Sequence, residues 1–281
     1  MTAVVAGYGL SGVSFSSLAS SSASHKRIGL QLYSIKDDLE KDFSGSMTKL
    51  QKIGYHSVET YGFDGTTFFG KKLSEFNRML GDMGMMLFGT HTGSPVLPAD
   101  TQAKEWDLWK NVCAELKAAH ATRAIQSWLP PTQTMDELKR LAEHYNRVGE
   151  VCKKEGIRFG IHNHSAEFKK VDGVMIYDYL LEHTQPDLVF FQLDMGHALE
   201  AGADCVEYVK KYPGRFTSWH LTDHKPGVGD VELGLGDVDY DQLFTMTDMA
   251  KLDDLVVEQE TGEDRFAACQ RNFDFVVKRC K

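Results

Sequence analysis

The feature that most constrains the fold is a regular alternation of strand-like and helix-like runs. From residue 26 onward, eight runs rich in β-branched, aromatic and apolar residues each precede a run with helical periodicity. The strand-like runs cover residues 27–34, 56–62, 85–91, 121–128, 157–164, 188–196, 216–224 and 252–260. The helix-like runs cover residues 44–54, 73–84, 103–120, 132–156, 173–184, 203–213, 238–249 and 264–280. Several of them end in glycine just before the next strand, as at Gly54 and Gly84, which is typical of a helix C-terminus.

Eight such units in about 255 residues predict a single α/β domain, a (β/α)8 TIM barrel over residues 26–281. The alternative is a doubly wound open sheet, but no GxGxxG sequence follows the first strand-like run. The glycines of the run GLGDVD at residues 234–239 follow the seventh strand and lack a third glycine, so we expect a loop that closes over the site. No apolar stretch reaches the ~18 residues that a membrane-spanning helix needs.

The N-terminal segment differs from the rest of the chain. Residues 1–24 contain no Lys, Arg, Asp or Glu, and an apolar run is followed by a run of small residues and serines. Two interpretations remain open for residues 1–25: a shortened remnant of an export leader, or a low-complexity arm. The first would place the protein outside the cytoplasm, in the periplasm or beyond, and the second in the cytoplasm.

Polar residues gather where the strand-like runs end. A TIM barrel carries its chemistry at the C-terminal ends of its strands. Six of the eleven histidines lie at these ends, although barrel interiors are mostly filled by branched aliphatic residues. The polar residues there are Glu59, His91, Gln126, His162, His164, Glu167, Asp194, His197, His220, Asp223, His224, Glu258 and Glu260. We therefore expect a functional site at this end of the barrel.

The residue types at these ends indicate a metal site. Because the side chains of a strand alternate between its faces, His162 and His164 share one face, and Glu258 and Glu260 share another. Imidazoles and carboxylates that converge from neighbouring strands predict a site for one divalent ion, Mn²⁺, Zn²⁺, Co²⁺ or Mg²⁺. The strongest group is the one that three strand ends supply, Asp194, His220 and Glu258.

Eight motifs occur in order along the chain: IGLQLYSIKDDL, GYHSVETYG, THTG, GIHNHSAEF, FQLDMGHALEAGAD, WHLTDHK, GLGDVDYDQLF and VVEQE. Together they resemble the xylose isomerase-like TIM barrels, the sugar phosphate isomerase/epimerase superfamily that also includes endonuclease IV and inosose dehydratase. The resemblance runs from about Lys26 to the C-terminus. It implies a divalent metal held by four side chains from strands five to eight, of which the last three match Asp194, His220 and Glu258.

The first of these four ligands departs from the family pattern. The typical member has a glutamate at the end of strand five, where this chain has His162. Glu167, in the following loop, is the alternative, so the fourth ligand is expected to be His162 or Glu167. The family's epimerases use two metal-bound glutamates, one on each face of the sugar, and a histidine here weakens that comparison. Members that resemble inosose dehydratase also carry histidines at this place, which favours elimination or hydration beside a ketone.

The residues and the resemblance predict a metal-dependent isomerase or epimerase that acts on a keto or aldo sugar, or on a sugar derivative, through an enediolate. The alternative is a metal-dependent lyase or hydratase, a dehydratase-type enzyme on a keto-sugar or 3-keto-glycoside. A nuclease of endonuclease IV type is disfavoured, because the formal charge of −9 does not suit a nucleic-acid partner. A non-catalytic sugar-binding barrel is the fourth interpretation. The sequence leaves a homo-oligomer open.

Roles can be assigned to the polar residues on this basis. Glu258 or Glu260 is the expected base on one side of the substrate, and His162, His164 or Glu167 the expected acid on the other. We expect Glu258 on the metal and Glu260 behind it or facing the substrate. A neutral sugar is the expected substrate, because no glycine-rich phosphate loop and no paired arginines stand at the strand ends. The residues expected to bind it are His91, Gln126, His197, Asp223, His224 and Lys225.

Overall fold

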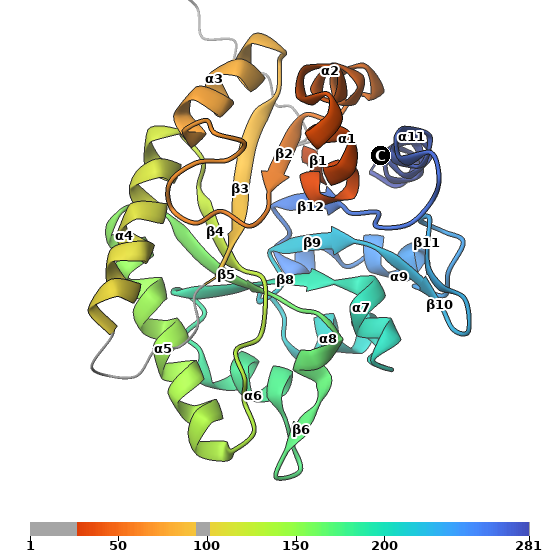
Figure 1. Cartoon of the computed structure of the whole chain (residues 1–281). Coiled ribbons are helices and arrows are strands. Elements are labelled where there is room, and N and C mark those ends of the chain that lie inside the picture. The colour runs from red at the N-terminus through yellow and green to blue at the C-terminus, as the bar shows by residue number, and fades with distance from the viewer. Residues whose placement is uncertain (1–26, 94–101, 281) are drawn as a thin grey trace, which may run out of the picture.

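The computed structural model describes residues 27–93 and 102–280, so the N-terminal segment singled out above lies outside the described residues. Its main strands are β1 (Arg27–Gln31), β2 (Ser57–Thr60), β3 (Met86–Thr92), β4 (Arg123–Gln126), β5 (Arg158–His162), β8 (Val189–Asp194), β9 (Ser218–Leu221) and β12 (Asp254–Val257). They pair in parallel and close into a barrel in the order β1-β12-β9-β8-β5-β4-β3-β2 (Figure 1). The predicted (β/α)8 barrel is confirmed.

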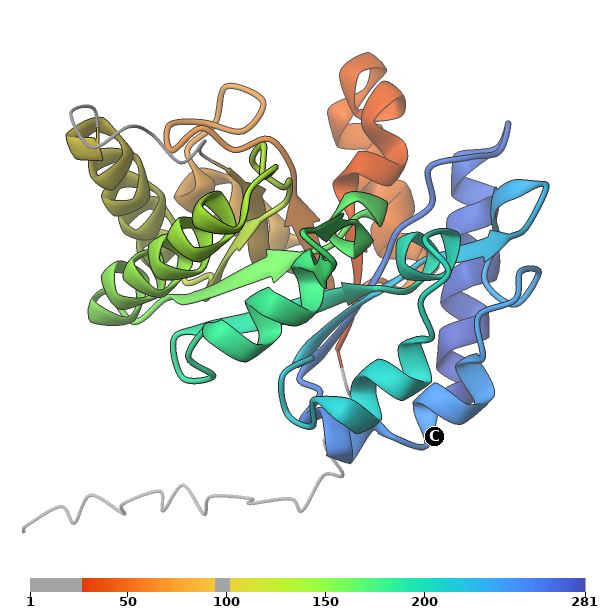
Figure 2. The same cartoon turned by 90° about the horizontal axis from the view of Figure 1, so that it is seen from below.

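The helices form an outer ring that follows chain order around the strands (Figures 1 and 2). They are α1 (Lys36–Lys41), α2 (Phe43–Ile53), α3 (Leu73–Asp82), α4 (Gln102–Ala118), α5 (Met135–Lys154), α6 (Ile176–His183), α7 (Met195–Glu200), α8 (Cys205–Lys211), α9 (Tyr240–Phe244), α10 (Thr247–Ala250) and α11 (Arg265–Arg279). Their ends follow local chemistry. The Thr134 hydroxyl accepts a hydrogen bond of 3.2 Å from the backbone N–H of Glu137 where α5 begins. Gly54 adopts φ 114° where α2 ends, which only glycine does without strain.

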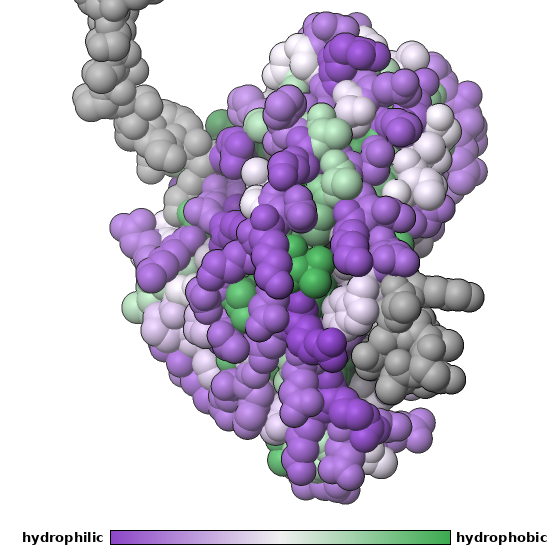
Figure 3. All heavy atoms as spheres, turned by 90° about the vertical axis from the view of Figure 1, so that its left-hand side faces the viewer, coloured by the Kyte–Doolittle hydropathy of each residue, from purple (hydrophilic) through white to green (hydrophobic). Residues whose placement is uncertain are grey.

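The outer face on the side of α4 and α5 is covered mostly by hydrophilic side chains, with small separate apolar areas (Figure 3). This is expected of amphipathic helices that bury one side against a barrel. Among the helices of residues 27–93 and 102–280, none is both long and apolar enough to cross a lipid bilayer.

Short elements that the sequence analysis did not predict follow several strands. They are the 3-10 turns η1 (Leu32–Ile35) and η2 (Ser165–Phe168), the helices α1 and α7, and the hairpins of β6 (Lys170–Val171) with β7 (Val174–Met175) and of β10 (Asp223–Lys225) with β11 (Gly229–Val231). The run 216–224, expected to be one strand, ends at Leu221 because the side chain of Asp223 accepts backbone hydrogen bonds and redirects the chain into the hairpin. The expected helix at 238–249 is divided into α9 and α10.

The barrel interior is apolar in its middle layer. Phe88, Ile125, Phe190 and Val256 form a buried cluster that is separate from the larger core between strands and helices. Gly160 makes room for this layer, because a Cβ atom there would lie 2.4 Å from Cζ of Phe190. A side chain on Gly160 would therefore displace the ring.

An ion pair closes the amino-terminal end of the barrel below this layer. The guanidinium of Arg123 lies 4.9 Å from the ring centroid of Phe88 and 5.1 Å from that of Phe190. It also pairs with the buried carboxylate of Asp254. We call Arg123 and Asp254 the barrel floor, and the polar strand ends lie at the opposite end.

Candidate metal and active site

Four of the polar strand-end residues meet in one buried group. His162 ends β5, Asp194 ends β8, His220 lies in β9 and Glu258 directly follows β12. One ligand atom from each lies within 4.8 Å of the ligand atoms of the other three, and the most exposed of them, Glu258, is 6% exposed. These four adjacent strands all end on the same edge of the barrel, which is why residues 96 positions apart, His162 and Glu258, become neighbours. We call this group the four-residue cluster.

The four-residue cluster fits a divalent cation. Within the described part of the chain, Nδ1 of His162 and Oδ2 of Asp194 are buried and have no hydrogen-bond partner. Buried polar atoms without partners are costly, and a cation between them would satisfy both. Two imidazoles and two carboxylates are also a donor set that Zn²⁺, Mn²⁺ and Co²⁺ accept.

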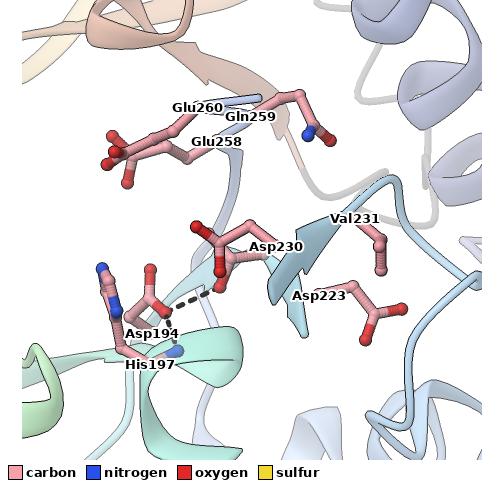
Figure 4. A pocket seen from close by; sticks show the side chains of 9 residues that line it. Asp194, His197, Asp223, Asp230, Val231, Glu258, Gln259 and Glu260 are labelled. Atoms are coloured by element: carbon pink, nitrogen blue, oxygen red, sulfur yellow. Dashed lines mark hydrogen bonds between the residues drawn. The ribbon is translucent and has the colours of Figure 1, made fainter. Parts of the chain in front are cut away.

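The surroundings of Asp194 direct one of its carboxylate oxygens into the cluster. Its Oδ1 accepts a hydrogen bond of 2.8 Å from the backbone N–H of His197 (Figure 4). It also accepts one of 2.6 Å from the hydroxyl of Thr222. Asn163 fixes the backbone on both sides, donating to the carbonyl of Asp194 and accepting from its N–H, each at 3.0 Å. Burial raises the pKa of Asp194, and the positive charge of the nearby imidazoles offsets part of this rise.

His220 is held between carboxylates. Its Nδ1 lies 2.9 Å from Oε2 of Glu258 and 3.8 Å from Oδ2 of Asp194. Its Nε2 lies 2.8 Å from Oε1 of Glu59, at the end of β2. Burial alone would lower the pKa of His220, but Glu258 and Glu59 outweigh it and raise the pKa to about 10. The cluster therefore attracts positive charge.

Two further histidines stand above the cluster. The rings of His162 and His164 lie 4.8 Å apart, and so do those of His164 and His197. Burial, with the positive charge of His197 added, lowers the pKa of His164 to about 4. Burial also lowers the pKa of His197, but Asp194 and the carboxylate of Glu200, 3.3 Å from its Nδ1, reverse the effect and raise it. The two imidazoles thus differ in their readiness to carry a proton.

Glu167, the other expected fourth ligand, lies outside the four-residue cluster. Its Oε2 accepts a hydrogen bond of 2.8 Å from the backbone N–H of His164 and caps the 3-10 turn η2. Burial raises the pKa of Glu167 to about 7. The structure brings His162 rather than Glu167 together with Asp194, His220 and Glu258. That His162 is the fourth metal ligand stays a prediction.

A cavity of about 390 Å³ opens above the cluster. Tyr33 and Tyr61 form part of its wall, with ring centroids 5.2 Å apart in an edge-to-face arrangement. No lysine or arginine is among the described residues that line it. The lining residues are Tyr33, Tyr61, Gly62, His91, Ser127, His162, His164, His197, Glu258 and Glu260. Its size and polar lining suit a small hydroxylated molecule.

The carboxylates of Glu258 and Glu260 point to the same side, and Gln259 points away from them (Figure 4), as the two-residue period predicts. Glu260 is exposed at the cavity mouth, whereas Glu258 is buried. Partial burial and the negative charge of Glu258 raise the pKa of Glu260. Glu260 is thus the carboxylate that an incoming molecule meets first.

The residues expected to bind substrate are divided between the cavity and its surroundings. His91 and His197 line the cavity. Gln126 is buried and donates to the carbonyl of Trp128 at 2.9 Å. Asp223 holds a loop, because its two oxygens accept from the N–H groups of His224, Gly234, Gly236 and Val238. His224 and Lys225 lie in strand β10 of the hairpin. Their contacts with substrate stay predictions.

The sequence analysis missed the two tyrosines of the cavity wall and the buried glutamines beneath the cluster. Gln31 and Gln192 each interrupt an apolar strand and are completely buried. Gln192 lies two residues before Asp194 and so shares its strand face. A polar residue inside a buried strand, in phase with a candidate ligand, was the signal that could have found it.

The fold and the site together define a TIM barrel with a candidate divalent-metal site at the C-terminal ends of its strands. The family model of the xylose isomerase-like TIM barrels matches residues 47–274. The chain belongs to this family, as the motifs in its sequence indicate.

Three known proteins show the range of the similarity. An inosose dehydratase of Clostridium perfringens is 30% identical over 131 residues, which is 40% of this chain and 43% of that protein, so the match spans less than half of either. A sugar phosphate isomerase/epimerase of Parabacteroides distasonis superimposes with a TM-score of 0.82 at 27% identity, over 91% of this chain and 100% of the other. A xylose isomerase-like TIM barrel protein of Mycobacterium smegmatis, in complex with magnesium, has a TM-score of 0.68 at 13% identity, over 91% and 96% of the two chains, and shares the fold.

Proposed function

We propose that this protein is a metal-dependent, sugar-modifying lyase that removes a proton beside a ketone and expels a leaving group from the next carbon. The observation that carries the proposal is the asymmetry of the four-residue cluster. His162, at the end of β5, belongs to the cluster, whereas the family's epimerases, which the sequence resembles, use two metal-bound glutamates, one on each face of the sugar. Strands β8 and β9 lie between β5 and β12, so the imidazoles that line the cavity come from β3, β5 and the segments after β5 and β8, whereas its carboxylates come from the segment after β12. Such a site suits two different proton-transfer steps better than two equivalent ones.

The chemistry divides between the ion and the side chains. A divalent ion held by His162, Asp194, His220 and Glu258 would polarise the ketone oxygen and acidify the neighbouring C–H bond. Glu260, exposed at the cavity mouth, accepts that proton, and the C–H electron pair forms a C=C bond. The C–O bond on the next carbon breaks, its electron pair goes to oxygen, and His197, the imidazole whose pKa is raised, protonates the leaving hydroxyl or alkoxide.

A neutral keto-sugar is the substrate class that the cavity supports. Its described lining contains two carboxylates and no lysine or arginine, which would disfavour a phosphate group. The tyrosine pair offers apolar ring surface to a sugar. The similarity to inosose dehydratase also supports elimination of water beside a ketone. A keto-inositol, a keto-hexose or a 3-keto-glycoside would meet these requirements.

Isomerase or epimerase activity is the second candidate. Glu258 and Glu260 both face the cavity, and the Parabacteroides structure is a sugar phosphate isomerase/epimerase at 27% identity. Epimerisation would share the first proton abstraction and end with a proton returned to carbon.

Incubation with a panel of keto and aldo sugars in D₂O, with Mn²⁺ or Co²⁺ added, tests the proposal. We expect a new conjugated C=C absorbance together with release of water or of an alcohol. Solvent deuterium in recovered or isomerised sugar, without that absorbance, would replace the lyase by the epimerase. Absence of both products with every sugar would reject both functions, and cleavage of an abasic DNA duplex would indicate a nuclease.

A further inference from the structure

A completely buried carboxylate lies beneath the four-residue cluster and does not belong to it. Oε1 of Glu59 lies 2.8 Å from Nε2 of His220 and 2.9 Å from Nε2 of His91. It also accepts a hydrogen bond of 2.8 Å from Gln31. Oε2 of Glu59 accepts one of 3.1 Å from Gln192. Both oxygens are thus occupied by donors, and neither faces the cavity.

The Glu59 contact decides which nitrogen of His220 faces the cluster. With Nε2 bound to Glu59, Nδ1 is the nitrogen near Glu258 and Asp194. A histidine ligand must offer an unprotonated nitrogen to the metal, and a carboxylate that accepts from the other nitrogen fixes this tautomer. The ring of His91 lies 5.0 Å from that of His220 at an interplanar angle of 15° and shares the same carboxylate oxygen. The stacked ring restricts rotation of His220.

We infer that Glu59 is a positioning residue for the metal centre, which holds His220 so that Nδ1 is its ligating nitrogen. The inference rests on the metal site of the proposed function. It assigns to Glu59 a hydrogen bond that strengthens metal binding without contact between Glu59 and the ion. Gln31, Gln192 and His91 in turn hold the carboxylate in place.

Glu59→Gln is the informative substitution because it keeps the size of the side chain and removes its second acceptor. An amide nitrogen in place of Oε1 would face the donors of His220, His91 and Gln31. In place of Oε2 it would face the amide nitrogen of Gln192, whose oxygen already lies 2.8 Å from Nε2 of His91. In either orientation of the new amide group, its N–H groups face other donors. The hydrogen bonds that hold the ring of His220 in place are therefore weakened.

The experiment titrates metal-free protein with Mn²⁺ and follows the free ion by electron paramagnetic resonance. We expect Glu59→Gln to weaken Mn²⁺ binding by about 10- to 100-fold, as loss of a hydrogen-bond partner of a ligating histidine does. Asp254→Asn is the matched control, because it neutralises a carboxylate that is also buried inside the barrel and paired with a cation, but in the barrel floor. It should lower the melting temperature and leave the Mn²⁺ Kd within about twofold. Glu59→Asp, which keeps the charge and shortens the reach, should bind Mn²⁺ with intermediate affinity.

A spectroscopic readout identifies the nitrogen itself. In Zn²⁺-loaded protein with ¹⁵N-labelled histidine, we expect a proton on Nε2 of His220 that is protected from exchange and a metal-shifted Nδ1. Both features should be lost or weakened in Glu59→Gln.

Tight Mn²⁺ binding by Glu59→Gln, or equal losses in Glu59→Gln and Asp254→Asn, would overturn the inference and leave the proposed function intact. Absence of saturable Mn²⁺ and Zn²⁺ binding in the unaltered protein would remove the metal centre and with it the proposed function.

Discussion

Asp194→Asn tests the metal site with little disturbance of the fold, because the two carboxylate oxygens of Asp194 have different surroundings. Oδ1 accepts from the N–H of His197 and the hydroxyl of Thr222, and Oδ2 has no partner. The asparagine oxygen can keep both hydrogen bonds, so its amide nitrogen takes the place of Oδ2. That nitrogen has no lone pair to offer a metal ion.

The magnitudes follow from this arrangement. Since no hydrogen bond is lost, the free energy of unfolding of the metal-free protein should change by less than about 1 kcal/mol. Metal affinity should fall by at least about 100-fold, or ~2.7 kcal/mol. Loss of a residue that only hydrogen-bonds to a metal ligand already lowers metal affinity by about 10- to 100-fold, and Asp194 is itself an expected ligand. Asp223→Asn is the contrasting control. Each oxygen of Asp223 accepts two backbone hydrogen bonds, so an amide in its place must lose two of them. The free energy of unfolding should therefore fall by about 2 kcal/mol, while the metal affinity stays the same.

Chemical denaturation in EDTA measures the first quantity, and calorimetric titration with Mn²⁺ measures the second. Unchanged Mn²⁺ affinity in Asp194→Asn would remove this residue from the ligand set. A loss of stability in Asp194→Asn as large as in Asp223→Asn would show that the carboxylate of Asp194 stabilises the fold and that its Oδ2 has a partner in the protein.

Three further predictions concern proton transfer, pH dependence and packing. Glu260→Gln should retain bound metal and lose most of the rate, since Glu260 lies outside the four-residue cluster; metal content and kcat measured together check this, and loss of metal would contradict it. Burial, together with a nearby arginine, lowers the pKa of His144 from 6.5 to about 4, so protonation favours the unfolded chain. The free energy of unfolding should therefore fall by up to ~3 kcal/mol between pH 6.5 and 4, and His144→Gln should remove that part of the slope in urea titrations. Gly160→Ala should lower the free energy of unfolding by about 1–3 kcal/mol, because the new methyl group would collide with the ring of Phe190. Gly81→Ala, which has open space around its Cβ, should leave the free energy of unfolding unchanged or raise it. Equal melting temperatures for the two variants would refute this.

The barrel could be predicted from the sequence because its signal is repeated. Each strand-like run and the helix after it independently indicate a β/α unit. A misplaced boundary in one unit therefore does not change the predicted fold. The errors fall where a single side chain overrides the pattern. Asp223 ends a strand early by accepting four backbone hydrogen bonds, and no periodicity in residues 216–224 reports that.

The site could be predicted in part for a similar reason. Asp194, His220 and Glu258 all stand at strand ends, so the topology alone brings them together. The position of Glu167 depended on a turn, because η2 directs its carboxylate to the backbone of His164. The partnership of Glu59 with His220 spans 161 residues and depends on closure of the barrel, which local sequence patterns do not encode.

The barrel floor limits the routes by which small molecules can enter and leave the barrel. Arg123 and Asp254 close one end of the barrel, and the apolar middle layer with Phe88 and Phe190 fills the space between that end and the cluster. In the described part of the chain, the pockets that adjoin the cluster are lined by residues at the C-terminal ends of the strands. If the proposed elimination takes place here, the substrate has to enter, and both products have to leave, on this side of the barrel. Such an enzyme is expected to be inhibited by its own products.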